Sequence, residues 1–509
     1  MAKLLFVSVN DVNAEGIRML SAILRRNGHR PYIAFLQRNG FPYNDTGKYL
    51  EAGRDVAEYD WTGIDAEGKP FRYCRGPDLT PQEQGLFLSL IEEIRPDLVG
   101  FTVTQPFVRS IAHLTGLIKK RFGIPILWGG PAPTSAPRSC SQWCDYVCVG
   151  EGDRAIVDVA LSIDRGQDLA GVNNIAYCRD GKFVQNPLHP LVDNLDELPF
   201  KDIFPRDKFL IEDDRLIRDF GEVSYSGRYH TATARGCPFS CSYCSENYVK
   251  GMYPRQKYLR RRSPSHVIGE LVEAGKTLRY RIVQFEDEVF ALNADWLEAF
   301  AEMYRERIGL PFECYIYPSH RRGNHLMLLK ETGLRWTCLS LQSGSDRINR
   351  EVFKRHFDKT LYLETARILR GLDIAYYADV ITFNPFETRE DLQATLDVLL
   401  RLPGRFPVFV NKLYLIEGTA IHDAVRNAKG SPDLGRVTDR TFRHYSRLFH
   451  AAGHYPKSTV YVAGRATIFE YLPFLLRLFF GLVGLSVKVA GLGRAAKGYI
   501  SGTDRKSVV

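Results

Sequence analysis

The sequence predicts two α/β domains in tandem, followed by a basic helical tail. Short apolar segments alternate with amphipathic helical patterns over the first 160 residues and again from residue 229 to 425, which is typical of parallel sheets whose strands are joined by helices. The final segment loses this alternation and gains positive charge. A chain of 509 residues, 45% of them hydrophobic, can bury several cores.

The first domain, residues 1–160, is predicted to be doubly wound. Its expected strands are Leu4–Val9, Pro31–Phe35, Leu98–Val103, Ile124–Trp128 and Tyr146–Val149. Its expected helices are Ala14–Asn27, Pro81–Ile94 and Val108–Phe122. Ligands of such sheets bind beyond the carboxyl ends of the strands. The loops expected there are Asn10–Gly16, Thr102–Gln105 and Gly129–Pro131.

Residues 161–225 are predicted to be a linker with a small hairpin around Arg179–Lys182, followed by an extended, proline-punctuated stretch. The second domain is expected over 226–425, and the helical extension over 426–509. The expected strands of the second domain are His230–Ala234, Ile282–Glu286, Glu313–Tyr317, Thr337–Leu341, Tyr376–Phe383 and Val408–Leu415.

Cys237, Cys241 and Cys244 lie directly after the first of these strands. Thiolates are the usual ligands of iron–sulfur clusters, and three ligands leave one iron of a cubane open. Gly236 and Pro238 allow a short loop to bend around a cluster. A zinc knuckle is the alternative, but a structural zinc site needs four protein ligands, and no partner pair lies close by in the sequence.

This CxxxCxΦC pattern, with Tyr243 as the aromatic residue, resembles the signature of the radical SAM superfamily. The resemblance implies a [4Fe–4S] cluster whose open iron binds S-adenosylmethionine (SAM) and cleaves it reductively to a 5′-deoxyadenosyl radical. It also implies that the six βα units form a partial (β/α)6 barrel. An electron donor such as a flavodoxin or a ferredoxin is the protein partner expected for this chemistry.

Two acidic and polar segments resemble SAM contacts of this superfamily. Glu286 and Asp287 end the second expected strand, like the acidic segment near the methionyl amine of SAM, where a carboxylate accepts hydrogen bonds from the ammonium group. Glu288 is a further candidate. Gln342 and Ser343 follow the fourth strand, in a turn similar to the one that contacts the ribose and carboxylate of SAM; Gln342 stands where glutamate is usual.

Loops of the first domain resemble the B12-binding domain that precedes many radical SAM modules, which implies bound cobalamin. The residues that match its motifs are Asp11, Asn13 and Gly16 for DxHxxG, Thr102 and Thr104 for the second loop, Gly129 and Gly130 for the glycine turn, and Glu151 for the closing GEG turn. Asn13 replaces the histidine that would ligate cobalt from below, and an amide is a poorer ligand than imidazole. The lower face of cobalamin is therefore expected to lack a protein nitrogen; a domain that kept the fold and lost the cofactor is the alternative.

The number and spacing of the cysteines, together with the N-terminal segment, indicate the cellular compartment of the protein. Ten cysteines in 509 residues are too few for a disulfide scaffold, which indicates a reducing cytosol. Cys140, Cys144 and Cys148 are evenly spaced but lack a fourth ligand, so we expect buried apolar residues rather than a second cluster. Met1–Val9 is expected to be a strand and not a signal peptide.

The tail carries most of the charge. Residues 441–509 contain ten Lys/Arg and two Asp/Glu, a net of +8 out of +9 for the whole chain. This distribution argues against nucleic acid as a partner of the core and favours an anionic partner of the tail, such as a membrane surface. Tyr471–Ala490 is strongly apolar with one narrow basic stripe, which predicts a helix in a membrane interface; burial against the barrel or in a dimer contact is the alternative.

These observations predict an enzyme with three cofactors: a [4Fe–4S] cluster, SAM and cobalamin. The expected reaction is methylation of an unactivated carbon of a small hydrophobic substrate, such as an isoprenoid lipid, because most understood members of the resembled family methylate such carbons. A radical reaction without methyl transfer, such as the oxidative ring closure of the tetrapyrrole cyclases, is the first alternative. A noncatalytic cobalamin or redox sensor is the second.

Overall fold

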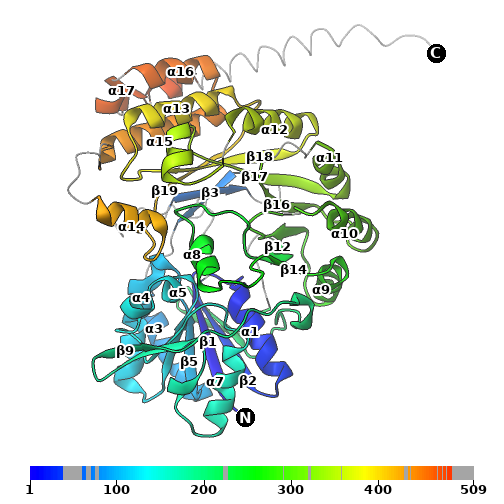
Figure 1. Ribbon diagram of the computed structural model, residues 1–509, viewed down its shortest axis with the longest axis vertical. Coiled ribbons are helices and arrows are strands. Elements are labelled where there is room, and N and C mark those ends of the chain that lie inside the picture. The colour runs from blue at the N-terminus through cyan, green and yellow to red at the C-terminus, as the bar shows by residue number, and fades with distance from the viewer. Residues whose placement is uncertain are drawn as a thin grey trace.

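The computed structural model describes residues 1–37, 60–64, 70–74, 79–221, 227–290, 292–318, 323–356, 358–428, 434–435, 437–466, 468–472, 474–476 and 478–483. An N-terminal sheet occupies one end of the molecule, a second sheet lies above it, and the C-terminal helices lie at the far end (Figure 1). The predicted fold class is confirmed: a doubly wound domain, then a partial barrel, then a helical extension.

The N-terminal sheet has nine strands in the order β11-β10-β2-β1-β5-β6-β7-β8-β9. Their bounds are β1 (Lys3–Val9), β2 (Arg30–Leu36), β5 (Leu98–Thr102), β6 (Ile126–Gly129), β7 (Tyr146–Cys148), β8 (Ile175–Arg179), β9 (Lys182–Gln185), β10 (Lys208–Glu212) and β11 (Arg215–Arg218). The strands from β10 to β7 are parallel, and antiparallel pairs finish both edges. The stretch that we expected to be a linker therefore adds four strands to this sheet.

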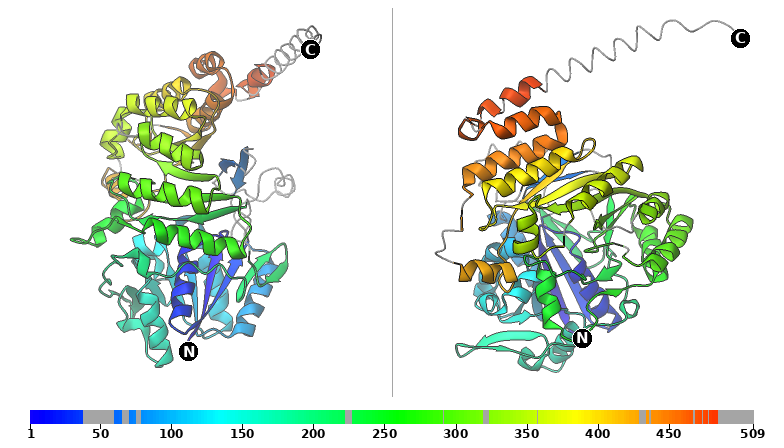
Figure 2. Two further views of the ribbon diagram at one scale, coloured as in Figure 1. Left: turned by 90° about the vertical axis from the view of Figure 1, so that its right-hand side faces the viewer. Right: turned by 45° about the horizontal axis from the view of Figure 1, so that its top comes forward.

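Helices cover both faces of this sheet because its central strands present apolar side chains to both faces in turn. Leu4 and Phe6 of β1 pack toward α1 (Glu15–Arg26) and α7 (Ala155–Asp164). Leu5 and Val7 pack toward the opposite pair of helices. That pair is α3 (Pro81–Ile94) and α4 (Val108–Arg121). The loops at the carboxyl ends of the strands face the second domain (Figures 1 and 2).

The second sheet has six parallel strands in the order β12-β15-β16-β17-β18-β19. Their bounds are β12 (Arg228–Thr231), β15 (Ile282–Phe285), β16 (Phe312–Ile316), β17 (Leu334–Gln342), β18 (Ala375–Thr382) and β19 (Val408–Lys412). The helices outside the curved sheet are α9 (Pro264–Thr277), α10 (Ala294–Arg307), α11 (Gly323–Thr332), α12 (Lys359–Gly371) and α13 (Arg389–Arg401). Because β12 and β19 are its two edges, the barrel is open along one side.

Two strand pairs and four short helices lie between these elements. Two strand pairs, β3 (Asp60–Ile64) with β4 (Pro70–Cys74) and β13 (Ala234–Arg235) with β14 (Arg260–Arg261), are antiparallel. The short helices α5 (Pro131–Ser135) and α6 (Pro137–Cys140) follow β6, α8 (Ser245–Met252) follows the cysteine loop, and α14 (Ala420–Asn427) follows β19.

The C-terminal helices pack behind α13 of the half-barrel (Figure 2). They are α15 (Asp439–His454), α16 (Lys457–Arg465) and α17 (Ile468–Tyr471), followed by a helical stretch described to residue 483. Leu476 and Phe480 of that stretch are buried in the half-barrel core, whereas Phe474 and Leu478 are exposed. The predicted helix Tyr471–Ala490 thus has one packed face as far as it is described, and residues 484–490 lie outside the described residues. None of the helices in the described part of the chain is long and apolar enough to cross a membrane.

His444 of α15 makes the stability of this extension sensitive to acid. Its side chain is buried, neither ring nitrogen has a hydrogen-bond partner among the described residues, and burial lowers its pKa to about 4. The unfolded chain gains a proton at His444 below pH about 6.5, whereas the folded chain does so only near pH 4. Unfolding therefore becomes more favourable as the pH falls between these values.

We expect His444→Phe to lessen this loss of stability, so that its melting temperature falls less between pH 7 and pH 5 than that of the wild type. Thermal unfolding at both pH values measures the difference. An equal fall in the two proteins would show that His444 does not control the acid response.

Candidate active site at the domain interface

The cysteine loop connects β13 to α8 in the second domain. Gly236 has φ +88°, and a Cβ atom there would lie 2.5 Å from the carbonyl oxygen of Tyr258, so this position accepts only glycine. Cys237, Cys241 and Cys244 are free and partly buried, and Cys244 is the N-cap residue of α8. The loop therefore presents three unpaired thiols from one short turn.

Contacts with three other elements hold this loop in place. The backbone N–H of Ser242 donates to the carbonyl oxygen of Phe353 (2.8 Å). The carbonyl oxygen of Ser242 in turn accepts from the backbone N–H of Ile421 in α14 (3.0 Å). Phe239 stacks on Tyr317, with ring centroids 4.3 Å apart. The thiols are thus fixed at the carboxyl ends of the strands, where catalytic groups of such barrels lie.

The electrostatics of the loop favour a bound cation. Burial raises the pKa of Cys237 to about 11 and that of Cys244 to about 12, and the Glu288 carboxylate raises both further. Iron binds thiolates, so the positive charge of the iron has to offset the free-energy cost of ionising these buried thiols. The described residues contain no group of three His, Cys, Asp or Glu side chains arranged around a single ion. A cubane does not need one, since each thiolate binds a different iron, and three soft thiolates fit that cluster.

The three acidic residues that follow β15 lie in three different environments. Glu286 Oε1 lies 2.6 Å from Nδ1 of His230 in β12. Asp287 is buried and accepts from the backbone N–H (2.9 Å) and the hydroxyl (2.6 Å) of Thr233; burial raises its pKa to about 6. Burial also raises the pKa of Glu288 to about 7. Asp287 therefore supports the strand end, and Glu286 lies beside β12. Glu288 raises the pKa of the three thiols.

The turn after β17 carries a strained residue and an unsatisfied atom. Gln342 has φ +60°, a conformation that side-chain-bearing residues adopt mainly under constraint from their surroundings. Its Nε2 donates to Asp379 (3.2 Å), but its buried Oε1 has no hydrogen-bond partner among the described residues. Ser343 is buried, and its hydroxyl accepts from the N–H of Ser345 (3.1 Å). An unpaired amide oxygen at this place fits a ligand with hydroxyl or amine donors, such as SAM.

A cavity of about 410 Å³ lies at the carboxyl ends of the N-terminal strands. Five of the predicted cobalamin-binding residues line it: Gly16, Thr102, Gly129, Gly130 and Glu151. Asp11, Asn13 and Thr104 are not among the described residues that line it. Gly130 has φ +104°, and a Cβ atom there would lie within 3.2 Å of Thr102 and Val103, so the turn has no space for a side chain. Apolar side chains such as Phe6, Leu20 and Leu127 form much of the remaining wall, which fits a large, mostly apolar ligand.

Asn13 lies in the loop before α1. Its backbone N–H donates to Asp11 Oδ1 (2.9 Å), and its buried Oδ1 has no hydrogen-bond partner among the described residues. The adjacent Ala14 has φ +28°, so the backbone is strained at this point. The loop fits a ligand that brings a hydrogen-bond donor.

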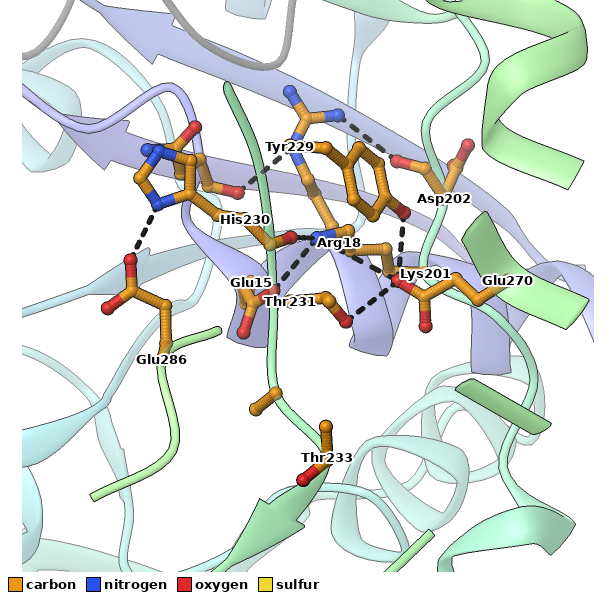
Figure 3. Close-up of polar contacts among 12 residues, drawn as sticks. Glu15, Arg18, Lys201, Asp202, Tyr229, His230, Thr231, Thr233, Glu270 and Glu286 are labelled. Carbon is orange, nitrogen blue, oxygen red and sulfur yellow. Dashed lines mark hydrogen bonds and ion pairs between the residues drawn. The ribbon is translucent and has the colours of Figure 1, made fainter. Parts of the chain in front are cut away.

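A buried polar network joins the two domains beside this cavity (Figure 3). Lys201 Nζ lies 2.8 Å from Glu15 Oε1 at the start of α1, packs over the ring of Tyr229, and donates to the carbonyl oxygen of His230 in β12. Glu270 in α9 accepts from the hydroxyl of Tyr229 (2.8 Å). The sequence did not reveal these residues, because single lysines, histidines and glutamates in unrelated segments form no motif.

Arginines of the β13–β14 strand pair make a second connection. Arg235, two residues before Cys237, pairs with Asp153 (2.7 Å), and Arg260 pairs with Glu151. Glu151 and Asp153 belong to the turn that follows the last parallel strand of the N-terminal sheet. The cysteine loop is therefore attached through its own strand to the rim of the cavity.

An open parallel barrel with a three-thiol loop after its first strand is an arrangement that would hold an iron–sulfur cluster. Comparison with protein families agrees, since residues 231–399 match the radical SAM superfamily and residues 78–160 match the B12 binding domain. The chain therefore carries a radical SAM domain and, before it, a B12-binding domain. Its two domains are those that hold a [4Fe–4S] cluster, SAM and cobalamin.

The curated relatives include a methyltransferase and a cyclase. The chain is 25% identical over 321 residues to an uncharacterised methyltransferase of Pyrococcus horikoshii, which covers 62% of this chain and 66% of the relative. It is 28% identical over 323 residues to the anaerobic magnesium-protoporphyrin IX monomethyl ester cyclase of Rubrivivax gelatinosus, which covers 60% of this chain and 54% of the cyclase. The chain thus spans about half to two thirds of these relatives.

Solved structures share the arrangement of domains. The radical SAM methyltransferase TsrM from Kitasatospora setae, with cobalamin and a [4Fe–4S] cluster bound, has a TM-score of 0.61 at 17% identity and covers 84% of this chain and 76% of its own. The cobalamin-dependent radical SAM enzyme OxsB has a TM-score of 0.56 at 14% identity and covers 87% of this chain and 57% of its own. At these identities the likeness concerns the fold.

Proposed function

We propose that the protein is a cobalamin-dependent methyltransferase that acts on an unactivated carbon of a small hydrophobic substrate. The observation that carries this proposal is the attachment of the cysteine loop to the rim of the cobalamin-type cavity through Arg235 and Arg260. When bound, the cluster and SAM supply a radical that removes a hydrogen atom from the substrate, and cobalamin supplies the methyl group. The shared interface supports this proposal, because reagents held on its two sides would lie within reach of one substrate.

The chain's own residues bind and orient these groups. Cys237, Cys241 and Cys244 hold the cluster, and Tyr243 packs beside them against Phe353. The residues assigned to SAM are Glu286, Asp287, Gln342 and Ser343, with Asp287 acting through Thr233 at the end of β12. The residues assigned to cobalamin are Asp11, Asn13, Gly16, Thr102, Thr104, Gly129, Gly130 and Glu151.

Product analysis tests this reaction. The reconstituted holoenzyme is incubated without oxygen with SAM that carries a deuterated methyl group, a reductant, and an isoprenoid-containing lipid extract as the source of substrate. The proposal expects both S-adenosylhomocysteine and 5′-deoxyadenosine, together with a lipid that has gained the deuterated methyl. 5′-Deoxyadenosine without S-adenosylhomocysteine would overturn methyl transfer.

An oxidative cyclisation is the second candidate, and the similarity to the anaerobic cyclases favours it. In that case 5′-deoxyadenosine forms without S-adenosylhomocysteine, so the same experiment distinguishes the two reactions. A flavodoxin or a ferredoxin is the proposed electron donor for either reaction.

A membrane surface is the proposed partner of the C-terminal helices, at the cytoplasmic face. Tyr471, Phe474, Leu478 and Leu482 are each more than half exposed and recur at intervals of three to four residues, so they share one helix face. The tail is basic, which suits anionic lipid. A helix with such a face binds in the headgroup region of a bilayer and favours a hydrophobic substrate.

We expect the wild-type protein to sediment with vesicles that contain phosphatidylserine and the Phe474→Asp/Leu478→Asp variant to remain in the supernatant. Each of these exposed side chains contributes roughly 1.5–3 kcal/mol to the free energy of membrane binding when it is fully buried. Ile217→Asp, which alters an exposed apolar residue of β11, is the matched control. Equal sedimentation of all three proteins would contradict this interface.

A further inference from the structure

His230 lies near the carboxyl end of β12, on the face opposite to its neighbours in the strand. Tyr229 and Thr231 are buried, and both donate from their hydroxyls to Glu270 in α9 (2.8 and 3.0 Å). The carbonyl oxygen of His230 accepts from the ammonium group of Lys201 (Figure 3). The backbone of β12 is therefore anchored on both sides of His230, and a substitution here changes little besides the imidazole ring.

The imidazole of His230 donates to Glu286, which follows the neighbouring strand β15. Nδ1 of His230 lies 2.6 Å from Oε1 of Glu286. An ionised carboxylate only accepts hydrogen bonds, so the hydrogen atom of this contact is on Nδ1. The backbone N–H of Glu286 also donates to the carbonyl oxygen of Thr231 (2.8 Å). Glu286 is thus held at its backbone and at one carboxylate oxygen.

The second carboxylate oxygen of Glu286 remains available to a ligand. Oε2 forms no hydrogen bond with the described residues, and the Glu286 side chain is 31% exposed. His230 is the one basic side chain that the described part of the chain brings within ion-pair distance of this carboxylate. The Glu286 carboxylate, together with burial, raises the pKa of Tyr315 on β16 well above its usual range. The charge of Glu286 therefore acts inside the half-barrel.

The two neighbouring carboxylates lack this combination of a fixed orientation and a free oxygen. Asp287 is buried and uses both oxygens on Thr233. Glu288 forms no hydrogen bond with the described residues, so no such contact among them orients its carboxylate. An ammonium group brings three donors and a positive charge, and a charge-assisted hydrogen bond to a carboxylate is about twice as strong as a neutral one. Glu286 is therefore the carboxylate of this segment best prepared to bind an amine.

We propose that His230 is a positioning residue for SAM, whose hydrogen bond to Oε1 of Glu286 holds Oε2 toward the methionyl amine. This inference rests on the proposed function in taking Glu286 as the carboxylate that binds SAM. Without the imidazole, the Glu286 side chain regains rotational freedom, and SAM binding has to restore one orientation at a cost in free energy. His230 acts through Glu286 and needs no contact with SAM.

Binding of two ligands to the cluster-loaded, full-length protein tests this role without turnover. Equilibrium dialysis without oxygen and without reductant measures the affinity for SAM and for 5′-methylthioadenosine, which lacks the methionyl amine and carboxylate. We expect His230→Ala to weaken SAM binding by about ten- to a hundredfold, the value of a hydrogen bond to a charged group, and to leave 5′-methylthioadenosine binding unchanged. His230→Asn, whose amide can donate in place of Nδ1, should retain most of the SAM affinity.

A double-mutant cycle shows whether His230 acts through Glu286. Glu286→Gln and the double variant His230→Ala/Glu286→Gln should bind SAM equally weakly, because the imidazole has no carboxylate left to orient. Losses that add up in the double variant would overturn the proposal. An equal loss of affinity for SAM and for 5′-methylthioadenosine in His230→Ala would also overturn it, since the effect would then concern the whole site and not the amine.

His189→Ala is the matched control, because Nε2 of His189 lies 2.8 Å from Oδ2 of Asp158 in the first domain. This variant loses a similar histidine–carboxylate pair and should bind SAM like the wild type. A loss of SAM affinity equal to that of His230→Ala would show a general effect of removing such a pair and overturn the proposal. A wild type that binds SAM but forms no S-adenosylhomocysteine would contradict the proposed methyl transfer and leave these binding results intact.

Discussion

Replacement of Cys241 by alanine is expected to abolish the reductive cleavage of SAM. The thiol is one of three that the loop between β13 and α8 presents, and a cubane held by two ligands loses the site-differentiated iron on which SAM binding depends. Even the mutation of a residue that only contacts a metal ligand lowers metal affinity or activity by about 10- to 100-fold. We therefore expect 5′-deoxyadenosine formation to fall by more than about 100-fold, with a parallel loss of iron.

Cys178→Ala is the control for this substitution. Cys178 is a free, exposed cysteine in β8 of the other sheet, next to the edge strand β9, so its removal should leave iron content and 5′-deoxyadenosine formation unchanged. Liquid chromatography of 5′-deoxyadenosine, normalised to iron per chain, compares the variants. If Cys241→Ala retained cleavage at wild-type iron content, Cys241 would not be a cluster ligand.

Replacement of Gly129 by leucine is expected to remove cobalt from the protein while leaving iron in place. Gly129 ends β6 and lines the cavity, and a Cβ atom there would lie 3.7 Å from Cys148, an ordinary contact. The backbone therefore tolerates a side chain, but the leucine occupies space that the cofactor needs. Overpacking costs about 1–3 kcal/mol, which weakens cobalamin binding by about ten- to a hundredfold.

The matched control is Gly85→Leu on the exposed face of α3, where a Cβ atom would meet nothing within 4 Å. Metal analysis by mass spectrometry gives cobalt and iron per chain for both variants. Normal cobalt in Gly129→Leu would place the cofactor outside this cavity. A joint loss of cobalt and iron would show general misfolding instead.

The sequence predicted the strands of the half-barrel and β1, β2, β5, β6 and β7 of the first sheet, because their signals are local. The helix Pro81–Ile94 has both predicted bounds, since Thr80 forms a capping box at its start and Pro96 follows its end. The loops with glycine turns or clustered cysteines were also visible, because the chemistry requires these residues close together in the sequence. Five predicted cobalamin residues therefore line one cavity.

What the sequence could not show depends on tertiary contacts. Residues 161–225 looked like a linker because their strands are short, yet β8–β11 pair with both edges of the first sheet. Lys201 and Glu270 meet only after the two domains pack together. Asp287 and Glu286 are adjacent in sequence, but a strand end turns one into the core and leaves the other partly exposed. No periodicity distinguishes these environments.

The most direct test of this account is the metal content and absorption spectrum of the full-length protein purified without oxygen. The account predicts about four iron and four sulfide per chain, the composition of a [4Fe–4S] cluster, and one cobalt with the absorption bands of a corrinoid. Zinc in place of iron, or iron without cobalt after incubation with hydroxocobalamin, would contradict an enzyme that joins both cofactors at one interface.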